Sequence, residues 1–359
     1  MIRFYGQDMI DTTTNRFYYY CHPQEGTRMH VHMPLRDMAA AWDGTKAIEY
    51  LSDKKEYAEM RQSLIDAVRC TVDFYLQSLS PMQQNCLIPS KEILLEPVNI
   101  GHSALLLLAM CNSLELNIIE DHEIHDVKNA IDGLTSGIIL MQLDNGAFST
   151  YFGDDDFHKG IAFFPGEAML ALVTAYKFEL LDPSRSQAVL QTILSAFDFY
   201  SNYHDTGDAD MNYNIWQVIA FSGLYDCLND QREKQTQVAT YILTMCQEIC
   251  QSKSWKYQLA RGQSFYVNLE TVEIACGLDA LVEGISVATL EQEIELVGLF
   301  ERNAANAIQF LSWMQSHVPE SCVVGRGGLG YGGVCVLEQR LDVTGHAISA
   351  LTKLQKLPH

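Results

Sequence analysis

The strongest constraint on the fold is a segment type that recurs along the whole chain. Six segments are apolar, rich in small residues and opened by polar residues, and their starts lie 47 to 76 residues apart. Self-similarity at this period indicates stacked supersecondary units rather than unrelated helices. With 48% hydrophobic residues, the chain has enough apolar material for a large core. The six segments start at Arg36, His102, Glu167, Asn214, Glu270 and His346.

Longer and more polar helical patterns separate these segments. Their apolar residues recur at the three- and four-residue spacing of a helix with one buried face. An alternation of buried and amphipathic helices predicts helical hairpins closed into a ring, that is, an all-α (α/α)6 toroid with residues 1–359 as a single domain. The amphipathic patterns cover residues 55–79, 120–142, 185–202, 231–251 and 290–316.

Six inner and five outer helices make eleven, whereas a ring of six hairpins has twelve. The missing outer helix would precede Arg36, where residues 1–33 show no helical pattern. Either the ring lacks one outer helix there, or the irregular N-terminal segment or a partner chain fills the position. The sequence therefore predicts a site for a protein partner or for self-association at this gap.

Charge and cysteine usage limit the classes of partner. The formal net charge is −21, which opposes binding to nucleic acid and to anionic membranes. The apolar runs are shorter than the roughly 18 residues of a membrane span, and the N-terminus has no apolar signal region. The ten cysteines form no close CxxC pair and lie mostly in apolar patterns, as reduced core thiols do. These features predict a cytoplasmic protein that acts on a small molecule.

Aromatic residues beside turn residues precede several of the predicted inner helices. We expect them to plug the gaps between neighbouring hairpins. They are Phe17, Phe148, Trp255 and Tyr331.

Several of these motifs resemble those of known α/α-toroid enzymes. The stretch from Gln142 to Phe148 (QLDNGAF) resembles the Gln-Gly-aromatic repeat of terpenoid cyclases and protein prenyltransferases. The segments FPGEAMLAL at Glu167, NIWQVIA at Asn214 and DVTGHAISAL at His346 are similar to (α/α)6 sugar-processing proteins such as N-acylglucosamine epimerases and unsaturated glucuronyl hydrolases. The resemblance implies the toroid fold and, more weakly, sugar chemistry.

The motifs depart from the cyclase pattern at the residues that carry its chemistry. Asp154–Asp156 lack the Asp-x-Asp-Asp spacing of class II terpene cyclases, and no three residues assemble the ligand set of a catalytic zinc. The glycine-rich stretch 325–333 lacks the Lys-Ser/Thr of a phosphate-binding loop. We therefore predict no cofactor.

The catalytic candidates are polar residues at the openings of the inner helices. Glu167 begins an otherwise apolar helix and suits a general acid or base, although a first-turn carboxylate also stabilises a helix N-terminus. His346 and His102 each follow a glycine and suit proton transfer, or alternatively hydrogen-bonded packing. Asp208, in the acidic loop 205–210, could pair with Glu167 as in glycoside chemistry, or the loop could cap the next helix.

The substrate-binding candidates lie at the same openings. Arg36 suits a carboxylate or phosphate clamp, or an ion pair with Asp37, with Asp43 or with an acid of a neighbouring inner helix such as Glu270. Trp216 suits stacking on a sugar ring, or packing between hairpins. The full set is Arg36, Trp216, Asn214, Glu270 and Asp342.

The resulting hypothesis is an enzyme that binds a small polar, saccharide-like substrate and works by general acid/base chemistry. Hydrolysis and epimerisation both fit. The alternatives are a cyclase-like enzyme of the terpenoid or peptide-modifying kind, and a non-catalytic scaffold that holds a partner.

Overall fold

The computed structural model describes residues 1–83, 86–154, 156–207, 209–261, 271–316, 328–329 and 338–357. The candidates Asp208 and Glu270 lie outside these residues, as do Tyr331 and most of the stretch 325–333. The described chain forms two compact units, one of residues 1–70 with 243–359 and one of residues 71–242. Helices α2 (Ala58–Leu76) and α9 (Arg232–Gln251) each contain one of the two boundaries. The single-domain organisation stays a prediction.

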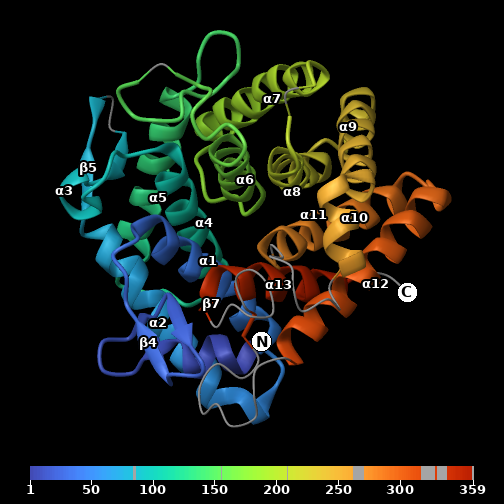
Figure 1. The fold of residues 1–359 in the computed structure, drawn as a ribbon. Coiled ribbons are helices and arrows are strands. Elements are labelled where there is room, and N and C mark those ends of the chain that lie inside the picture. Colours follow the sequence, from blue (N-terminus) through green and yellow to red (C-terminus); the bar gives the residue numbers. More distant parts are fainter. Residues whose placement is uncertain are drawn as a thin grey trace. The chain divides into compact units, whose positions relative to one another are not determined.

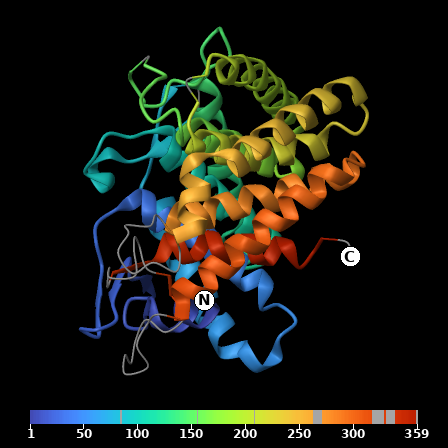
Figure 2. The ribbon, with the colours of Figure 1, turned by 45° about the vertical axis from the view of Figure 1, so that its right-hand side comes forward.

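In the first unit, three buried helices pack side by side (Figure 1). Helix α13 (Leu341–Leu354) contacts both α1 (Pro34–Tyr50) and α11 (Thr271–Leu290). Helix α12 (Ile294–Ser316) covers α11, and α10 (Lys253–Arg261) contacts both α11 and α12 (Figure 2). Small residues on the three buried helices allow this close approach, because a glycine or alanine leaves room for side chains of the neighbouring helix.

The N-terminal segment contains short elements in place of an outer helix. They are η1 (Phe4–Asp8), β1 (Ile10–Asp11), β2 (Arg16–Phe17), β3 (Tyr20–His22) and β4 (Thr27–Met29), and η2 (Lys55–Tyr57) follows α1. Strand β3 pairs antiparallel with β4 and also with β7 (Gln339–Arg340), so that Tyr20 lies opposite Arg340. This pairing fixes residues far apart in sequence at the start of α13. No outer helix occurs in residues 1–33, as the pattern predicted, and the proposed partner at that position stays a prediction.

In the second unit, α6 (Phe164–Lys177) packs between α4 (Ile100–Glu115) and α8 (Met211–Cys227). Helices α5 (Ile124–Leu140) and α7 (Pro183–Asp205) cover them, and the short elements β5 (Leu79–Pro81), β6 (Leu87–Pro89) and α3 (Lys91–Leu94) precede α4. Fourteen of the sixteen residues of α4 are buried, whereas α5 buries one face. This difference is the one that the two sequence patterns predicted.

All eleven predicted helices are present. The inner segments form α1, α4, α6, α8, α11 and α13, and the amphipathic ones form α2, α5, α7, α9 and α12. Among the described residues, no helix is long and apolar enough to cross a membrane.

The structure shows one of the predicted aromatic plugs, Phe148, beside its turn. Phe148 is fully buried, stacks on Tyr200 with ring centroids 6.5 Å apart, and donates its backbone N–H to the Tyr200 hydroxyl. The Gln142 amide donates to the carbonyl oxygens of Gly146 and Thr192, which ties the turn to α7. The Gln-Gly-aromatic motif therefore has a structural function in this chain.

Candidate functional site

The candidate site is a buried group of charged residues in the first unit. Each of its three inner helices carries polar residues at three-, four- or seven-residue spacing, so that the residues of each row share one helix face. Contacts between the rows, described below, show that the faces are turned toward one another. The rows are Arg36, Asp43 and Lys46 on α1, Cys276, Asp279 and Glu283 on α11, and Asp342, His346, Ser349 and Lys353 on α13.

Asp342 is a buried carboxylate with cationic partners at the first turn of α13. Its Oδ2 lies 3.3 Å from Arg36 Nη1 and accepts hydrogen bonds from the Tyr19 hydroxyl, at 3.1 Å, and from Arg340. Its Oδ1 accepts from Arg340 Nε, at 3.1 Å, and from the Val343 N–H. Burial alone would raise the pKa of Asp342, but the charges of Arg36 and Arg340 outweigh it and hold that pKa below its usual value. Asp342 is therefore ionised at neutral pH.

Asp43, in the same cluster, has a pKa shifted in the direction opposite to that of Asp342. It is 1% exposed, and its carboxyl group lies directly on Gly345, where any Cβ atom would collide with Oδ2. No described residue donates a hydrogen bond to its Oδ1. Burial, with the negative charges of Asp342 and Asp279, raises the pKa of Asp43 well above its usual value. Burial and the two neighbouring carboxylates therefore favour the protonated form of the Asp43 carboxyl group.

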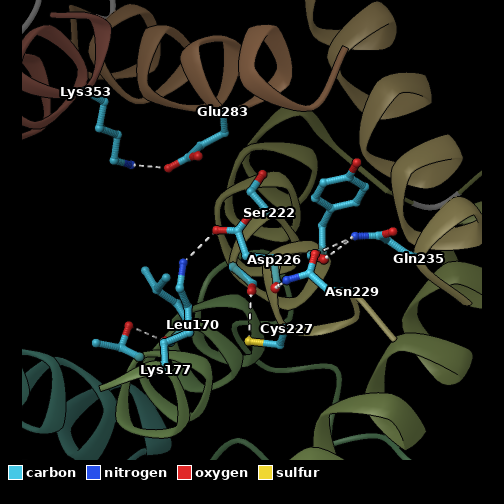
Figure 3. Close-up of polar contacts among 12 residues, drawn as sticks. Leu170, Lys177, Ser222, Asp226, Cys227, Asn229, Gln235, Glu283 and Lys353 are labelled. Atoms are coloured by element: carbon cyan, nitrogen blue, oxygen red, sulfur yellow. Dashed lines mark hydrogen bonds and ion pairs between the residues drawn. The ribbon is translucent and has the colours of Figure 1, made fainter. Parts of the chain in front are cut away.

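Asp279 and Lys353 form a buried ion pair next to these groups. Lys353 Nζ lies 2.8 Å from Asp279 Oδ1 and 2.7 Å from Glu283 Oε1, the second of which is drawn in Figure 3. Ser349 also donates to Asp279 Oδ1, while Oδ2 has no described hydrogen-bond partner. Burial lowers the pKa of Lys353, but the two carboxylates outweigh it and raise that pKa above the usual value. The ammonium group thus neutralises a carboxylate that is 0% exposed.

His346 lies on α13 one turn after Asp342 and directly after Gly345. It is 9% exposed, and burial lowers its pKa even though the charges of Asp279 and Asp342 act in the opposite direction. The imidazole is therefore neutral at neutral pH and able to accept a proton. The same two carboxylates would stabilise the imidazolium formed after proton transfer.

These shifts separate the protonation states of neighbouring groups. A histidine with a lowered pKa, a carboxyl group with a raised pKa and an ionised carboxylate lie in one cluster, and an acid/base site requires such a separation. The Arg36 side chain is 37% exposed and can donate to a bound ligand while it contacts Asp342. Among the described residues, no group of three His, Cys, Asp or Glu side chains has metal-binding geometry.

The raised pKa of Asp43 gives a pH-dependent stability prediction for Asp43→Asn. Since the folded protein holds this proton more tightly than the unfolded chain does, wild-type stability falls as the pH rises from the unfolded pKa toward the folded one. Asparagine has nearly the same shape and does not ionise. As the pH rises, the free energy of unfolding of the variant minus that of the wild type should therefore increase by up to about 1.4 kcal/mol per pH unit. Urea denaturation from about pH 4 to pH 8 measures this difference.

Asp342→Asn is the matched control, because the pKa of Asp342 is lowered and the sign reverses. The stability of this variant relative to the wild type should fall as the pH rises through the titration of the carboxyl group. A difference between Asp43→Asn and the wild type that stays constant with pH would contradict the protonation assigned to Asp43.

In the second unit, the Glu167 carboxylate lies against α4. Glu167 is buried on α6, and a Cβ atom on Gly101 would come within 2.5 Å of its Oε2. The glycine before His102 thus makes room for the carboxylate. The acid/base role of Glu167 stays a prediction.

Both ring nitrogens of His102 have hydrogen-bond partners. The ring Nδ1 accepts a hydrogen bond from the backbone N–H of Asn99, at 3.3 Å. The backbone N–H of His102 donates to Asn99 Oδ1, at 3.1 Å, so that the two residues form a capping box at the start of α4. Nε2 therefore carries the proton and donates to Glu96, at 2.9 Å. Burial lowers the pKa of His102 despite the nearby Glu96 charge. Its role in proton transfer stays a prediction, which our proposal below does not use.

Trp216 and Asn214 lie buried in the first turns of α8. Gly166 on α6 accommodates the Trp216 Cβ, so the indole is positioned where α6 and α8 approach closely. Asp210 caps the same helix by accepting from the Tyr213 N–H at 2.8 Å, which is the capping role that the acidic loop allowed. Substrate binding by Trp216 and Asn214 stays a prediction.

The structure thus brings together three predicted site residues, Arg36, Asp342 and His346. Sequence reasoning missed several others that complete the cluster. The available signal was a charged residue in the middle of an apolar inner helix, as in AAAWDGTKAI and CGLDALVEG. Sequence reasoning named Asp43 only as a possible ion-pair partner of Arg36, and the residues that it did not name are Tyr19, Asp279, Arg340 and Lys353.

Comparisons with known proteins show the fold. No known family and no curated protein matches the sequence. Among solved structures, the chain is similar to one titled "Crystal structure of D-mannose isomerase", with a TM-score of 0.59 and 13% sequence identity over 99% of this chain and 95% of that one. This likeness confirms the predicted all-α (α/α)6 toroid class. The terpenoid cyclase resemblance stays a prediction.

Proposed function

We propose that this protein is an enzyme that isomerises or epimerises a small saccharide by general acid/base chemistry. The observation that carries the proposal is the buried cluster in which His346, with a lowered pKa, shares α13 with the Asp342–Arg36 pair, while Asp43, with a raised pKa, lies against Gly345. The solved structure that the chain resembles is named for a sugar isomerase, which supports the substrate class.

In this mechanism, His346 removes the proton from a carbon atom next to the sugar carbonyl group. Asp43 gives its proton to the carbonyl oxygen, so that a neutral enediol forms instead of an enolate. The Asp43 carboxylate then takes a proton from the neighbouring enediol hydroxyl, and His346 returns its proton to the other carbon. The carbonyl group has moved by one carbon, and all protons and electrons balance without an oxidant. Return of the proton to the opposite face of the same carbon would give an epimer.

Two charged neighbours assist this proton transfer. Asp342 orients the Arg36 guanidinium, whose remaining N–H groups can donate to substrate oxygens where negative charge develops. Asp342 and Asp279 also stabilise the imidazolium electrostatically. Neither carboxylate has to leave its observed contacts during the reaction.

Hydrolysis of a glycoside is the second candidate, because Asp43 and Asp342 have oppositely shifted pKa values. One protonated and one ionised carboxyl group are the pair that glycoside hydrolysis requires. In that reaction Asp43 would protonate the leaving oxygen.

The test begins with a thermal-shift screen of monosaccharides, uronic acids, sugar phosphates and glycosides. A sugar at 100 times its dissociation constant should add about 2.7 kcal/mol to the free energy of unfolding. The sugars that raise the melting temperature of the protein, together with D-mannose, D-glucose and D-fructose, are then incubated with it in D₂O. Proton NMR should show exchange of the proton next to the carbonyl group and a new sugar. Release of a reducing sugar from a glycoside without carbon-bound exchange would favour hydrolysis, and no turnover of any sugar would overturn the proposal.

A further inference from the structure

A groove on the first unit, separate from the charged cluster, has the lining of a carbohydrate site. It has a volume of about 550 Å³ and lies between α10, the last residues of α9 and one face of α12. This volume is in the range of small-molecule pockets, about 300–1,000 Å³. Figure 2 shows α10 beside α12.

The floor of the groove is held in a fixed geometry. Trp255 is fully buried and packs on α11 at Gly277, where a Cβ atom would come within 2.5 Å of Trp255 Cζ3. The indole Nε1 donates to Asn303 Oδ1 at 3.0 Å, and Asn303 Nδ2 donates to the Leu299 carbonyl at 2.9 Å. The Asn303 amide therefore has a set orientation, and one of its N–H groups and one oxygen lone pair have no partner among the residues that the structure describes.

One face of α12 continues this lining with alternating amides and aromatic rings. Asn303, Asn306, Phe310 and Trp313 are three or four residues apart and all line the groove. At 1.5 Å per residue, they cover about 15 Å of the helix. Asn306 is exposed, Trp313 is half-buried, and the buried residues Phe300, Ala304 and Ala307 occupy other positions around the same helix.

The charge of the groove lining limits the classes of ligand that the groove can bind. Among the described residues, the lining includes Lys256 and no carboxylate, in a chain with 45 acidic residues. This favours a neutral or anionic ligand over a cation. Amides both donate and accept hydrogen bonds, as sugar hydroxyls do, and an aromatic ring can stack on the apolar face of a pyranose.

We propose that this groove binds an oligosaccharide, with pyranose rings on Trp313 and hydroxyl groups on Asn303 and Asn306. The site goes beyond the proposed activity, since none of its residues belongs to the acid/base cluster. It would hold a longer saccharide on the enzyme surface independently of turnover.

Isothermal titration calorimetry of the full chain with maltotetraose and with mannotetraose tests the proposal. We expect binding that changes tryptophan fluorescence and that Trp313→Ala weakens by about tenfold or more. Asn306→Ala, an exposed change that leaves the core intact, should weaken it by about fivefold. Ser312→Ala is the matched control, because Ser312 is exposed on the same helix but does not line the groove.

His346→Asn separates this site from the acid/base cluster. Binding that survives this variant but is weakened by Asn306→Ala supports the groove, whether or not the protein shows isomerase activity. Binding lost in His346→Asn and unchanged in Asn306→Ala places the saccharide in the cluster and overturns the inference. Absence of binding at millimolar tetrasaccharide, or sedimentation data that show a second copy of the chain whose association Asn306→Ala and Trp313→Ala weaken, also overturns it.

Discussion

Replacing His346 with asparagine should lower kcat/KM by about 10²- to 10⁴-fold, the usual contribution of a positioned general base. His346 is the candidate base because burial holds its pKa below the ordinary histidine value, whereas the pKa of Asp43 is raised and Asp342 is bound to two guanidinium groups. Asparagine is smaller and keeps polar atoms near the backbone, so the fold should persist. The measurement is the steady-state rate on the sugar selected by the D₂O experiment, with folding checked by thermal denaturation.

The pH profile adds a readout that a structural role of His346 would not change. A general base must be unprotonated, so the rate falls as the pH drops through its pKa. Burial lowers the pKa of His346, and the acid limb of kcat/KM should therefore lie below pH 6.5, the ordinary value for histidine. The residual activity of His346→Asn should lack this limb.

His122→Asn is the matched control, because the His122 side chain is 74% exposed and belongs to no part of the cluster. It should leave kcat/KM and the acid limb unchanged. A His346→Asn enzyme within threefold of the wild type, with the same acid limb, would refute the assignment of His346 as the base.

The helices could be predicted from the sequence because their signals are local. The spacing of apolar residues distinguishes α4, buried nearly all round, from α5, which buries one face. The polar openings of the inner helices likewise identified Arg36, Asp342 and His346. Each of these signals depends on residues within one helix.

The rest of the site depends on contacts that no local pattern contains. Tyr19 lies close to Asp342 because β3 pairs with β7, which joins residues more than 300 positions apart. Asp43 fits against α13 only because residue 345 is a glycine. Asp43 and Asp279 were visible as charges within apolar helices, but their opposite hydrogen-bonding environments come from the packing of α1 and α11 on α13.

The role of His102 shows that a sequence pattern alone does not distinguish a capping histidine from a catalytic one. Glu or Gln is the usual third helical residue of a capping box, whereas in α4 an imidazole takes that position and closes the box with Asn99. A histidine after a glycine at a helix start suggests chemistry in both α4 and α13. The capping role of His102 depends on its ring partners Asn99 and Glu96, and the second of these contacts exists only in the folded structure.

Lys353→Met should lower the free energy of unfolding by about 3–5 kcal/mol, the cost of leaving one partner of a buried ion pair uncompensated. Methionine keeps most of the apolar stem, so the loss comes mainly from the charge. Asp279 is 0% exposed and Ser349 would remain its only described hydrogen-bond donor, at 3.3 Å. Urea denaturation at neutral pH measures the change as a shift of the midpoint.

The double variant Lys353→Met with Asp279→Asn tests whether the buried charge is the cause. Removing both charges should recover more than half of the loss, since replacing a whole buried pair costs much less than breaking it. Lys356→Met is the control, because Lys356 pairs with Glu49 at an exposed position and should change stability by less than about 1 kcal/mol. The raised pKa of Lys353 also fixes the pH dependence: its contribution is full below the unfolded pKa and is lost as the pH rises toward the folded one. If the double variant is as unstable as Lys353→Met alone, the loss comes from packing around the lysine stem, and the electrostatic explanation is wrong.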